Sequence, residues 1–273
     1  MSINPITRNK IKDYLNGFID QQLAVYSQRN LREFHDVDSY LAAISSDGDL
    51  KPFHASIIPS AIMRLNRFER SLSTGLGSTF EECARLIALD HHAVAIRSYD
   101  IHTSLDQAVW ASIDLLISNI DRNNQRQIPS ITEMLEKLQS IALTGIAENH
   151  VVRADLYVQR HDGSELFFEI KSPKPNKGQC LEVMQRLLRI YAIKQNSTLP
   201  THAFYAMAYN PWGANRASYT YSIVKKYTDF TNAVVIGQEF WSLIGESSTY
   251  TELLEIYREV GLSKSSEITK KLL

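Results

Sequence analysis

The chain has 273 residues, of which 44% are hydrophobic and 22% charged, an ordinary globular composition that excludes disorder, collagen and coiled coil as descriptions of the whole chain. Its 29 basic and 30 acidic residues give a net charge of −1, which argues against a bulk nucleic-acid coat but permits a nuclease with a locally basic cleft. No apolar run approaches the roughly 20 residues of a membrane helix, and no signal-peptide pattern opens the chain. Two cysteines cannot form a disulfide framework, so we expect a cytoplasmic protein without a membrane partner.

Helical patterns fill the first half of the chain. Asn4 followed by Pro5 is typical of a helix start. Further helices are predicted over about residues 60–71, from about Ser78, and from about Ser104 to Ile120. Ser130 with Glu133 forms a capping-box pattern that predicts one more helix.

The hydrophobic period then changes to two. Residues 151–160 and 165–171 alternate apolar and polar side chains around the turn signal at 161–164, which predicts a β-hairpin. A helix over 177–194 and short strands over 203–209 and 233–236 follow, before two C-terminal helices. This order indicates an α+β fold, or an α/β fold with a mixed sheet.

The two faces of the hairpin differ in character. One face is apolar and should pack on a helix; it carries Leu156, Val158, Leu166, Phe168 and Ile170. The opposite face, which we expect to lie away from the core, carries Asp155, Glu169 and Lys171. Matching the apolar residues requires Asp155 to lie opposite Glu169. That register needs a three-residue loop in which Gly163 adopts a left-handed conformation.

Two carboxylates and an ammonium group would then converge at one end of the hairpin. Carboxylate oxygens are hard ligands that suit Mg²⁺, so Asp155 and Glu169 are candidate metal ligands, with the Ile170 carbonyl as a third. Lys171 would orient or activate the attacking water and stabilise charge on a phosphate. The pattern favours phosphodiester hydrolysis, although a solvated hairpin face with ordinary charges would show the same residues.

Other candidates are less specific. Glu81 flanks the apolar stripe of its predicted helix and could add a carboxylate to the site, or it could only cap that helix together with Ser78. Basic residues that could contact DNA are Lys174, Lys177, Arg67, Arg70 and Arg216, and each could equally be an ordinary surface charge.

The site residues resemble a known signature. Asp155 followed by Glu169-Ile170-Lys171 on the next strand resembles the PD-(D/E)XK nuclease motif, with Ala154 in place of its proline. Longer strings are similar to type II restriction endonucleases of the TdeIII/MjaII kind across about residues 50–245. These strings are Phe68–Thr74, Leu76–Glu82, Glu169–Cys180, Tyr209–Gly213 and Ile236–Trp241.

The resemblance implies a Mg²⁺-dependent enzyme that cuts both strands of duplex DNA at a short palindrome, with GGNCC-type sites as a guess. It implies a restriction-endonuclease core with a mixed sheet flanked by helices, a homodimer and a cognate DNA methyltransferase in the same system. It also strengthens Glu81 as a site residue and the helix bearing Arg67 and Arg70 as a DNA contact.

As a domain plan we expect a single nuclease domain over 1–273. Within it we expect a helical extension over 1–60, a catalytic core over 75–210 and DNA-binding or dimerisation elements over 211–273. Three alternatives stay open: a structure-directed repair or recombination nuclease, a non-catalytic DNA-binding module, and an RNA-processing nuclease, for which no RNA-binding signature is present.

Overall fold

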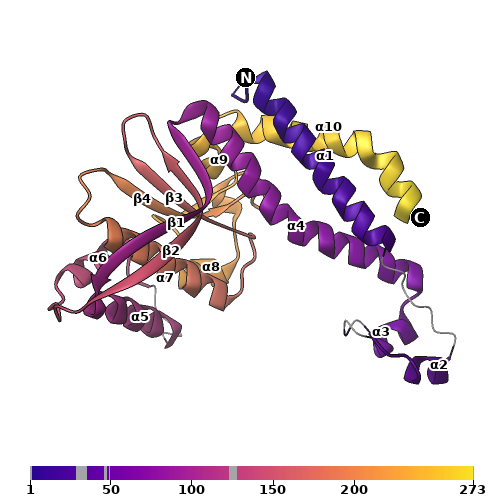
Figure 1. The fold of residues 1–273 in the computed structure, drawn as a ribbon, viewed down its shortest axis with the longest axis horizontal. Coiled ribbons are helices and arrows are strands. Elements are labelled where there is room, and N and C mark those ends of the chain that lie inside the picture. The colour runs from indigo at the N-terminus through magenta and orange to yellow at the C-terminus, as the bar shows by residue number, and fades with distance from the viewer. Residues whose placement is uncertain (1, 29–35, 46–47, 49, 123–127, 273) are drawn as a thin grey trace. The chain divides into compact units, whose positions relative to one another are not determined.

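The computed structural model describes residues 2–28, 36–45, 48, 50–122 and 128–272. The chain divides into two compact units. One comprises Met1–Arg8 and Phe80–Leu254, which we call the sheet unit, and the other comprises Asn9–Thr79 and Glu255–Leu273, which we call the helical unit. Figure 1 shows the elements of both.

Helices are the regular elements of the helical unit in the residues that the structure describes. Its elements come from α1 (Pro5–Gln28), α2 (Val37–Leu41), α3 (Pro52–Ile57), α4 (Ser60–His91) and α10 (Thr249–Leu272). The side chain of Asn4 accepts a 2.9 Å hydrogen bond from the amide of Thr7, which confirms the predicted start of α1. None of the described helices combines the length and the apolar character needed to cross a membrane.

Helix α4 corrects two predictions. The sequence predicted a helix over 60–71 and a new one from Ser78, but α4 runs without a break from Ser60 to His91. Gly75 lies inside it because the ring of Phe18 on α1 approaches closely, and an added Cβ would lie 2.5 Å from that ring. The glycine therefore permits helix packing rather than a turn, and the proposed Ser78–Glu81 capping box is wrong.

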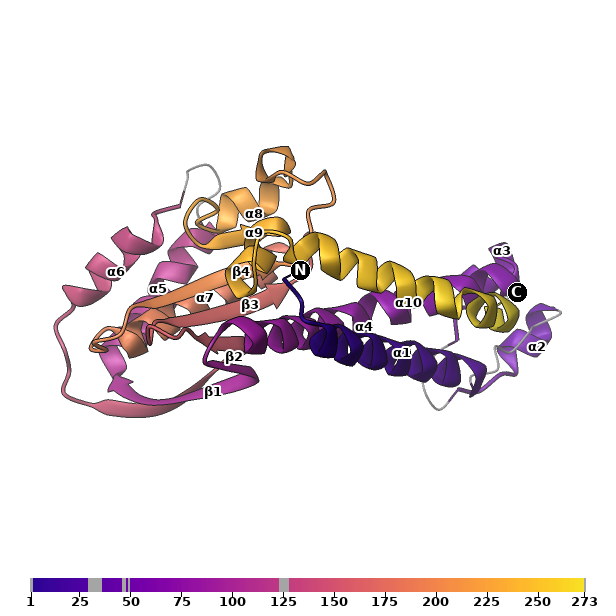
Figure 2. The same ribbon diagram turned by 90° about the horizontal axis from the view of Figure 1, so that it is seen from above.

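The sheet unit is built on five strands in the order β1-β2-β3-β4-β5. Their bounds are β1 (Val94–Asp106), β2 (Ala147–Gln159), β3 (Glu165–Lys171), β4 (Thr201–Met207) and β5 (Val234–Ile236). The first three strands are antiparallel and the last three parallel, so the predicted mixed sheet is confirmed. Figure 2 shows β1 and β2 as long neighbouring strands that curve away from β3 and β4.

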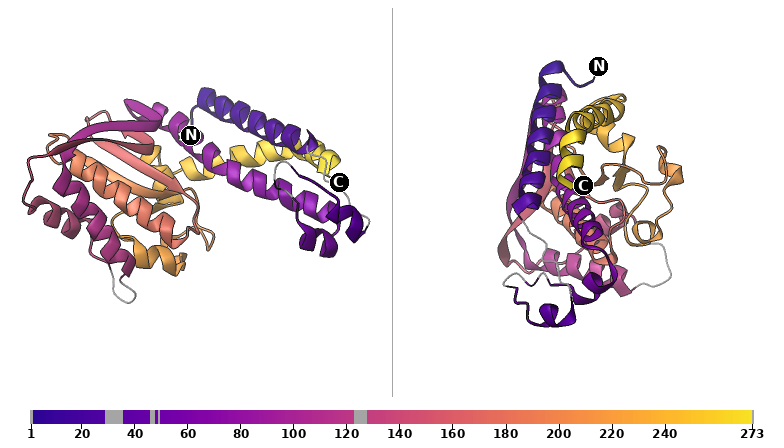
Figure 3. Two further views of the ribbon diagram at one scale, coloured as in Figure 1. Left: turned by 60° about the horizontal axis from the view of Figure 1, so that its bottom comes forward. Right: turned by 90° about the vertical axis from the view of Figure 1, so that its right-hand side faces the viewer.

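Helices cover both faces of this sheet. Helices α5 (Gln107–Arg122), α6 (Ile131–Gln139) and α7 (Lys177–Lys194) share a large apolar core with one face. The left view of Figure 3 shows helices lying across this face of the sheet. On the other face, Phe168 of β3 contacts Phe240 of α9 (Gln238–Ile244) with ring centroids 5.4 Å apart. The remaining elements are the short η1 (Arg216–Ser218) and α8 (Ser222–Tyr227). The capping box at Ser130 and the bounds of α7 are confirmed.

Strand β1 was not predicted. The sequence predicted a helix from Ser104, but β1 continues to Asp106 and α5 begins at Gln107. Asp106 accepts a 2.9 Å hydrogen bond from the amide of Ala108, and is therefore the capping residue of α5. The many polar side chains of β1 obscure the alternation typical of a strand. The strand is stabilised by its pairing with β2, a long-range contact that local sequence does not reveal.

The predicted hairpin register is confirmed. Leu156 lies opposite Phe168 and Tyr157 opposite Phe167, the alignment that brings Asp155 level with Glu169. Gly163 has a φ of 86°, and its amide donates to the carbonyl of Arg160 at 3.0 Å. The three-residue loop therefore has the left-handed glycine that the register requires.

The expected exposure of the acidic face is wrong. Tyr157 and Phe167 on that face belong to the large core cluster, and the Glu169 side chain is fully buried. The reason is the parallel β3–α7–β4 connection, which lays α7 across this face. The hairpin is consequently buried on both sides, which strand alternation alone does not reveal.

Candidate active site

The carboxylates and the lysine that the sequence singled out meet at the C-terminal end of β3. The Lys171 ammonium lies 3.0 Å from Oδ2 of Asp155 and 3.4 Å from Oε2 of Glu169. The same Oδ2 accepts a 2.8 Å hydrogen bond from the amide of Ile170. Asp155 lies just beyond the last paired residues of β2 and β3, so its side chain rather than its backbone joins the strands here.

Glu169 is the most buried member of this cluster. Its Oε2 accepts a 2.7 Å bond from Arg186, while its Oε1 is buried and has no hydrogen-bond partner. Burial, together with the negative charge of Asp155, raises the pKa of Glu169 to about 7, against the opposing effect of Arg186 and Lys171. An ionised carboxylate with an unsatisfied buried oxygen requires a further cation or donor.

Arg186 is a site residue that sequence reasoning missed. It extends from α7 and bridges Glu169 and Glu182, with 2.6 Å to the latter. A usable signal was present, because Arg186 lies three residues after Val183 and four before Ile190, both fully buried. A charged residue within the buried stripe of a helix needs an ionic partner.

Lys171 is a cation in this arrangement. Burial alone would lower its pKa, but the carboxylates of Asp155 and Glu169 outweigh burial and raise the pKa above its usual value. A lysine held protonated can bind and stabilise anionic oxygens.

The donor set suits a hard divalent cation. The orphaned Oε1 of Glu169 and the carboxylate of Asp155 are the oxygen ligands that Mg²⁺ prefers. Within the described parts of the chain, no group of three or more His, Cys, Asp and Glu side chains could hold a metal. A cation here would therefore have two side-chain ligands and would need backbone, water or phosphate oxygens for the rest.

Glu81 is bonded elsewhere. Its Oε2 lies 2.8 Å from Arg97 of β1, and Glu82 lies 3.2 Å from the same guanidinium. Arg97 is paired with Leu156, whose neighbour Asp155 is the predicted ligand. Glu81 is thus tied to the strand beside the cluster, and its direct participation stays a prediction.

Two of the predicted DNA contacts follow the cluster along the chain. The Lys174 ammonium lies 5.1 Å from the ring centroid of Trp212. Lys177 contacts the Tyr227 ring at 5.1 Å and forms a 2.5 Å ion pair with Asp121. The Lys174 side chain is exposed, so its charge is available to a phosphate.

Arg216 is engaged within the protein. Its guanidinium donates to the carbonyls of Val234 and Phe230 and to Glu239, and it stacks on the Phe230 ring at 4.4 Å. These bonds occupy donors that a guanine edge would need, so base reading by Arg216 would require them to break. Arg67 and Arg70 lie on α4 in the helical unit.

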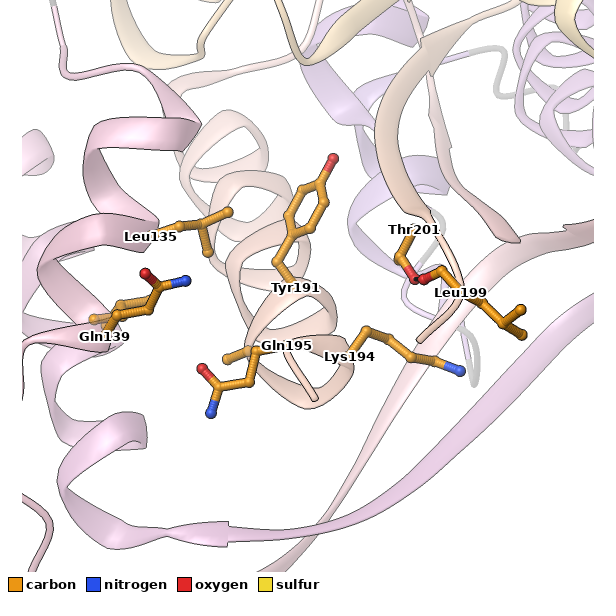
Figure 4. A pocket seen from close by; sticks show the side chains of 9 residues that line it. Leu135, Gln139, Tyr191, Lys194, Gln195, Leu199 and Thr201 are labelled. Atoms are coloured by element: carbon orange, nitrogen blue, oxygen red, sulfur yellow. Dashed lines mark hydrogen bonds between the residues drawn. The ribbon is translucent and has the colours of Figure 1, made fainter. Parts of the chain in front are cut away.

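A shallow hollow of about 180 Å³ lies at the other end of α7 (Figure 4). Tyr191, Lys194 and Gln195 of α7 line it together with residues of α6 and the start of β4. None of its lining residues belongs to the carboxylate cluster. The candidate active site is therefore the strand end and not this hollow.

A buried and a half-buried carboxylate beside a lysine, on a mixed sheet, are typical of the class of enzymes that act on phosphate esters. Comparison with known proteins specifies the class further. The family model described as "Type II restriction endonuclease, HinfI" matches residues 6–261. The chain therefore belongs to the HinfI family of type II restriction endonucleases.

Close relatives agree with this family. The type II restriction enzymes HgiBI and HgiEI of Herpetosiphon aurantiacus are each 79% identical to the chain over 273 residues, which covers both proteins completely. The expected restriction endonuclease, a site-specific deoxyribonuclease, is thus confirmed over the repair-nuclease, RNA-processing and non-catalytic alternatives. Enzymes of this class generally use divalent metal ions. The narrower TdeIII/MjaII grouping stays a prediction.

Proposed function

We propose that this restriction endonuclease is Mg²⁺-dependent and that Asp155, Glu169 and Lys171 form its catalytic cluster in a PD-(D/E)XK-type core. The observation that carries the proposal is the buried, unpartnered Oε1 of Glu169 beside Asp155 and Lys171. The Ile170 carbonyl and Glu81 are further candidate ligands.

Each residue of the cluster has its own proposed role. Asp155 and Glu169 would hold the cation, which when bound supplies charge neutralisation and a more acidic water. Lys171, kept protonated by both carboxylates, would bind an oxygen of the scissile phosphate and stabilise its growing negative charge. Arg186 would hold Glu169 in place from α7. Lys174 and Lys177 would contact neighbouring phosphates.

The proposed assembly follows from the number of sites. One cluster acts on one strand, so cutting both strands at a short palindrome fits a two-fold homodimer. We propose the sheet unit as the nuclease core, with residues 211–273 contributing to DNA binding or to the dimer. A cognate methyltransferase would protect the host's own sites, and GGNCC-type sites remain the proposed specificity.

Digestion of unmethylated phage DNA tests this function. With Mg²⁺ we expect discrete bands, and with EDTA we expect intact DNA. Sequencing of the fragment ends would give the recognition site and the stagger of the cut. A smear, or equal cutting in EDTA, would contradict the proposal.

A further inference from the structure

Ser98 has an unusual backbone conformation in the middle of a strand. Its φ is 50°, the only positive φ of a non-glycine residue among those that the structure describes. Left-handed conformations are unfavourable for L-residues, and they persist where the surrounding structure imposes them, often at functional sites. Serine is not a residue that adopts this conformation readily, so the position calls for a reason.

The β1–β2 pairing is interrupted at this residue. Arg97 pairs with Leu156 and Tyr99 pairs with Ala154, and the same register holds along both strands. By that register Ser98 lies level with Asp155, yet these two residues do not pair. No residue has been inserted, so the distortion affects both strands at the same level.

The burial of β2 shows what the distortion does. Ala154 and Tyr157 belong to the same core cluster although they are three positions apart, whereas Leu156 lies outside that cluster. In a regular strand, residues three apart point to opposite faces. The alternation of side chains therefore changes phase between Ala154 and Tyr157, where Asp155 lies.

Asp155 is consequently outside both ladders. It is unpaired with β1, and the β2–β3 pairing ends at Leu156. Its side chain instead accepts the Ile170 amide at 2.8 Å and the Lys171 ammonium at 3.0 Å. Ser98 therefore lies at the level of Asp155 on the neighbouring strand β1, while the Asp155 carboxylate is directed toward β3.

We propose that Ser98 is a positioning residue for Asp155: its left-handed backbone keeps β1 distorted, so that the Asp155 carboxylate turns toward Ile170 and Lys171. The inference rests on the proposed catalytic role of Asp155. Ser98 itself touches neither substrate nor metal in this account. Its contribution is the backbone conformation, and the hydroxyl is dispensable.

Two substitutions separate the backbone from the hydroxyl. Ser98→Gly keeps the left-handed conformation without steric cost and removes the hydroxyl. Ser98→Thr keeps the hydroxyl, but its β-branched side chain opposes a positive φ. Ser104→Thr is the matched control, because Ser104 lies on the same strand and pairs regularly with Asn149.

We expect the glycine variant to cleave within about twofold of the wild-type kcat. We expect Ser98→Thr to lose roughly tenfold to a hundredfold in kcat with little change in KM for DNA, because a misplaced carboxylate affects the chemical step. Ser104→Thr should behave as wild type. Ser98→Ala keeps an unbranched Cβ and lacks the hydroxyl, so it should also cleave within about twofold of the wild-type kcat; if Ser98→Thr does not fold, a large loss in Ser98→Ala overturns the inference.

Hydrogen exchange gives a readout independent of cleavage. The Ile170 amide donates to Asp155, so displacement of that carboxylate should speed exchange at Ile170 in Ser98→Thr. Exchange should stay at the wild-type rate in Ser98→Gly and Ser104→Thr. A structural defect alone would speed exchange along the whole of β1 and β2.

Full kcat with unchanged Ile170 exchange in Ser98→Thr would overturn the inference, as would an equal loss in Ser98→Gly. Asp155→Ala separates the catalytic role of Asp155 from the positioning role of Ser98. If Asp155→Ala cleaves normally, the proposed catalytic cluster itself fails. If Asp155→Ala is inactive while Ser98→Thr is fully active, only the role of Ser98 fails.

Discussion

The Glu169 carboxylate is held where its charge is unfavourable. It is fully buried, and burial beside Asp155 raises its pKa from 4.5 to about 7 despite two neighbouring cations. Active sites commonly hold such groups because a ligand bound there recovers the cost. For Glu169 that ligand would be a divalent cation, whose positive charge favours the ionised form.

This burial predicts a pH-dependent stability. The folded state binds more protons than the unfolded state between pH 4.5 and about 7, so the free energy of unfolding decreases as pH rises through that window. Glu169→Gln removes the ionisation and should raise the free energy of unfolding in EDTA at pH 8 by roughly 3 kcal/mol. Denaturant unfolding at pH 5 and pH 8 measures this. An identical pH slope in both proteins would contradict it.

Arg186 supports the ionised form of Glu169, so its removal should act on pH dependence. Arg186→Met should raise the pKa of Glu169 further, shift the acidic limb of the cleavage profile to higher pH and lower kcat at pH 7 by about tenfold. Arg186→Lys should recover part of the loss. Arg189→Met on the same helix is the control, since Arg189 pairs with Asp114 at 3.0 Å and not with the cluster. Equal effects of Arg186→Met and Arg189→Met would show that Arg186 has no special role.

At the scale of elements, local sequence patterns predicted the β2–β3 hairpin and helix α7 correctly. The three-residue loop with Gly163 set the hairpin register, and the bounds of α7 agree with its periodicity. Both depend on residues that are close in the chain. Strand β1 and the burial of the acidic face depend on distant segments, and local patterns do not contain that information.

Helix α4 provides a test at this scale. Gly75 and Gly77 stand two residues apart in its interior, but only Gly75 meets the Phe18 ring, and nothing lies within 4 Å of a Cβ at Gly77. Alanine normally favours a helix over glycine by about 1 kcal/mol, so Gly77→Ala should raise the thermal stability. Gly75→Ala should lower it by about 1 kcal/mol because the ring must move. Differential scanning calorimetry of both variants measures these changes in stability. A Gly75→Ala variant that is more stable than the wild type would contradict the close packing of Phe18 on Gly75.

Much of the candidate site could likewise be predicted from sequence. Asp155, Glu169 and Lys171 meet as the hairpin pattern required. Arg186 could not be assigned a partner because it reaches the cluster from a separate helix. Ser98 gave no signal at all, since a left-handed serine is a product of the tertiary structure.

At the scale of the whole molecule, each chain contributes one proposed cluster for two DNA strands. We expect a homodimer in solution, with a mass about twice the 31.1 kDa of the chain. Sedimentation equilibrium measures this mass with and without DNA. A protein that stays monomeric in both conditions while cutting both strands would contradict the expectation.

The central claim is that the cluster at the end of β3 performs the cleavage. Single-turnover cleavage by Asp155→Asn, Glu169→Gln and Lys171→Met tests it most directly, with DNA binding measured in parallel. Glu165→Gln is the matched control, because Glu165 is also buried on β3 and pairs with Lys194 at 2.8 Å, but at the opposite end of the strand. We predict a loss of at least about a hundredfold in each of the three variants, with DNA binding retained and Glu165→Gln active. Wild-type cleavage by either carboxylate variant would contradict the account.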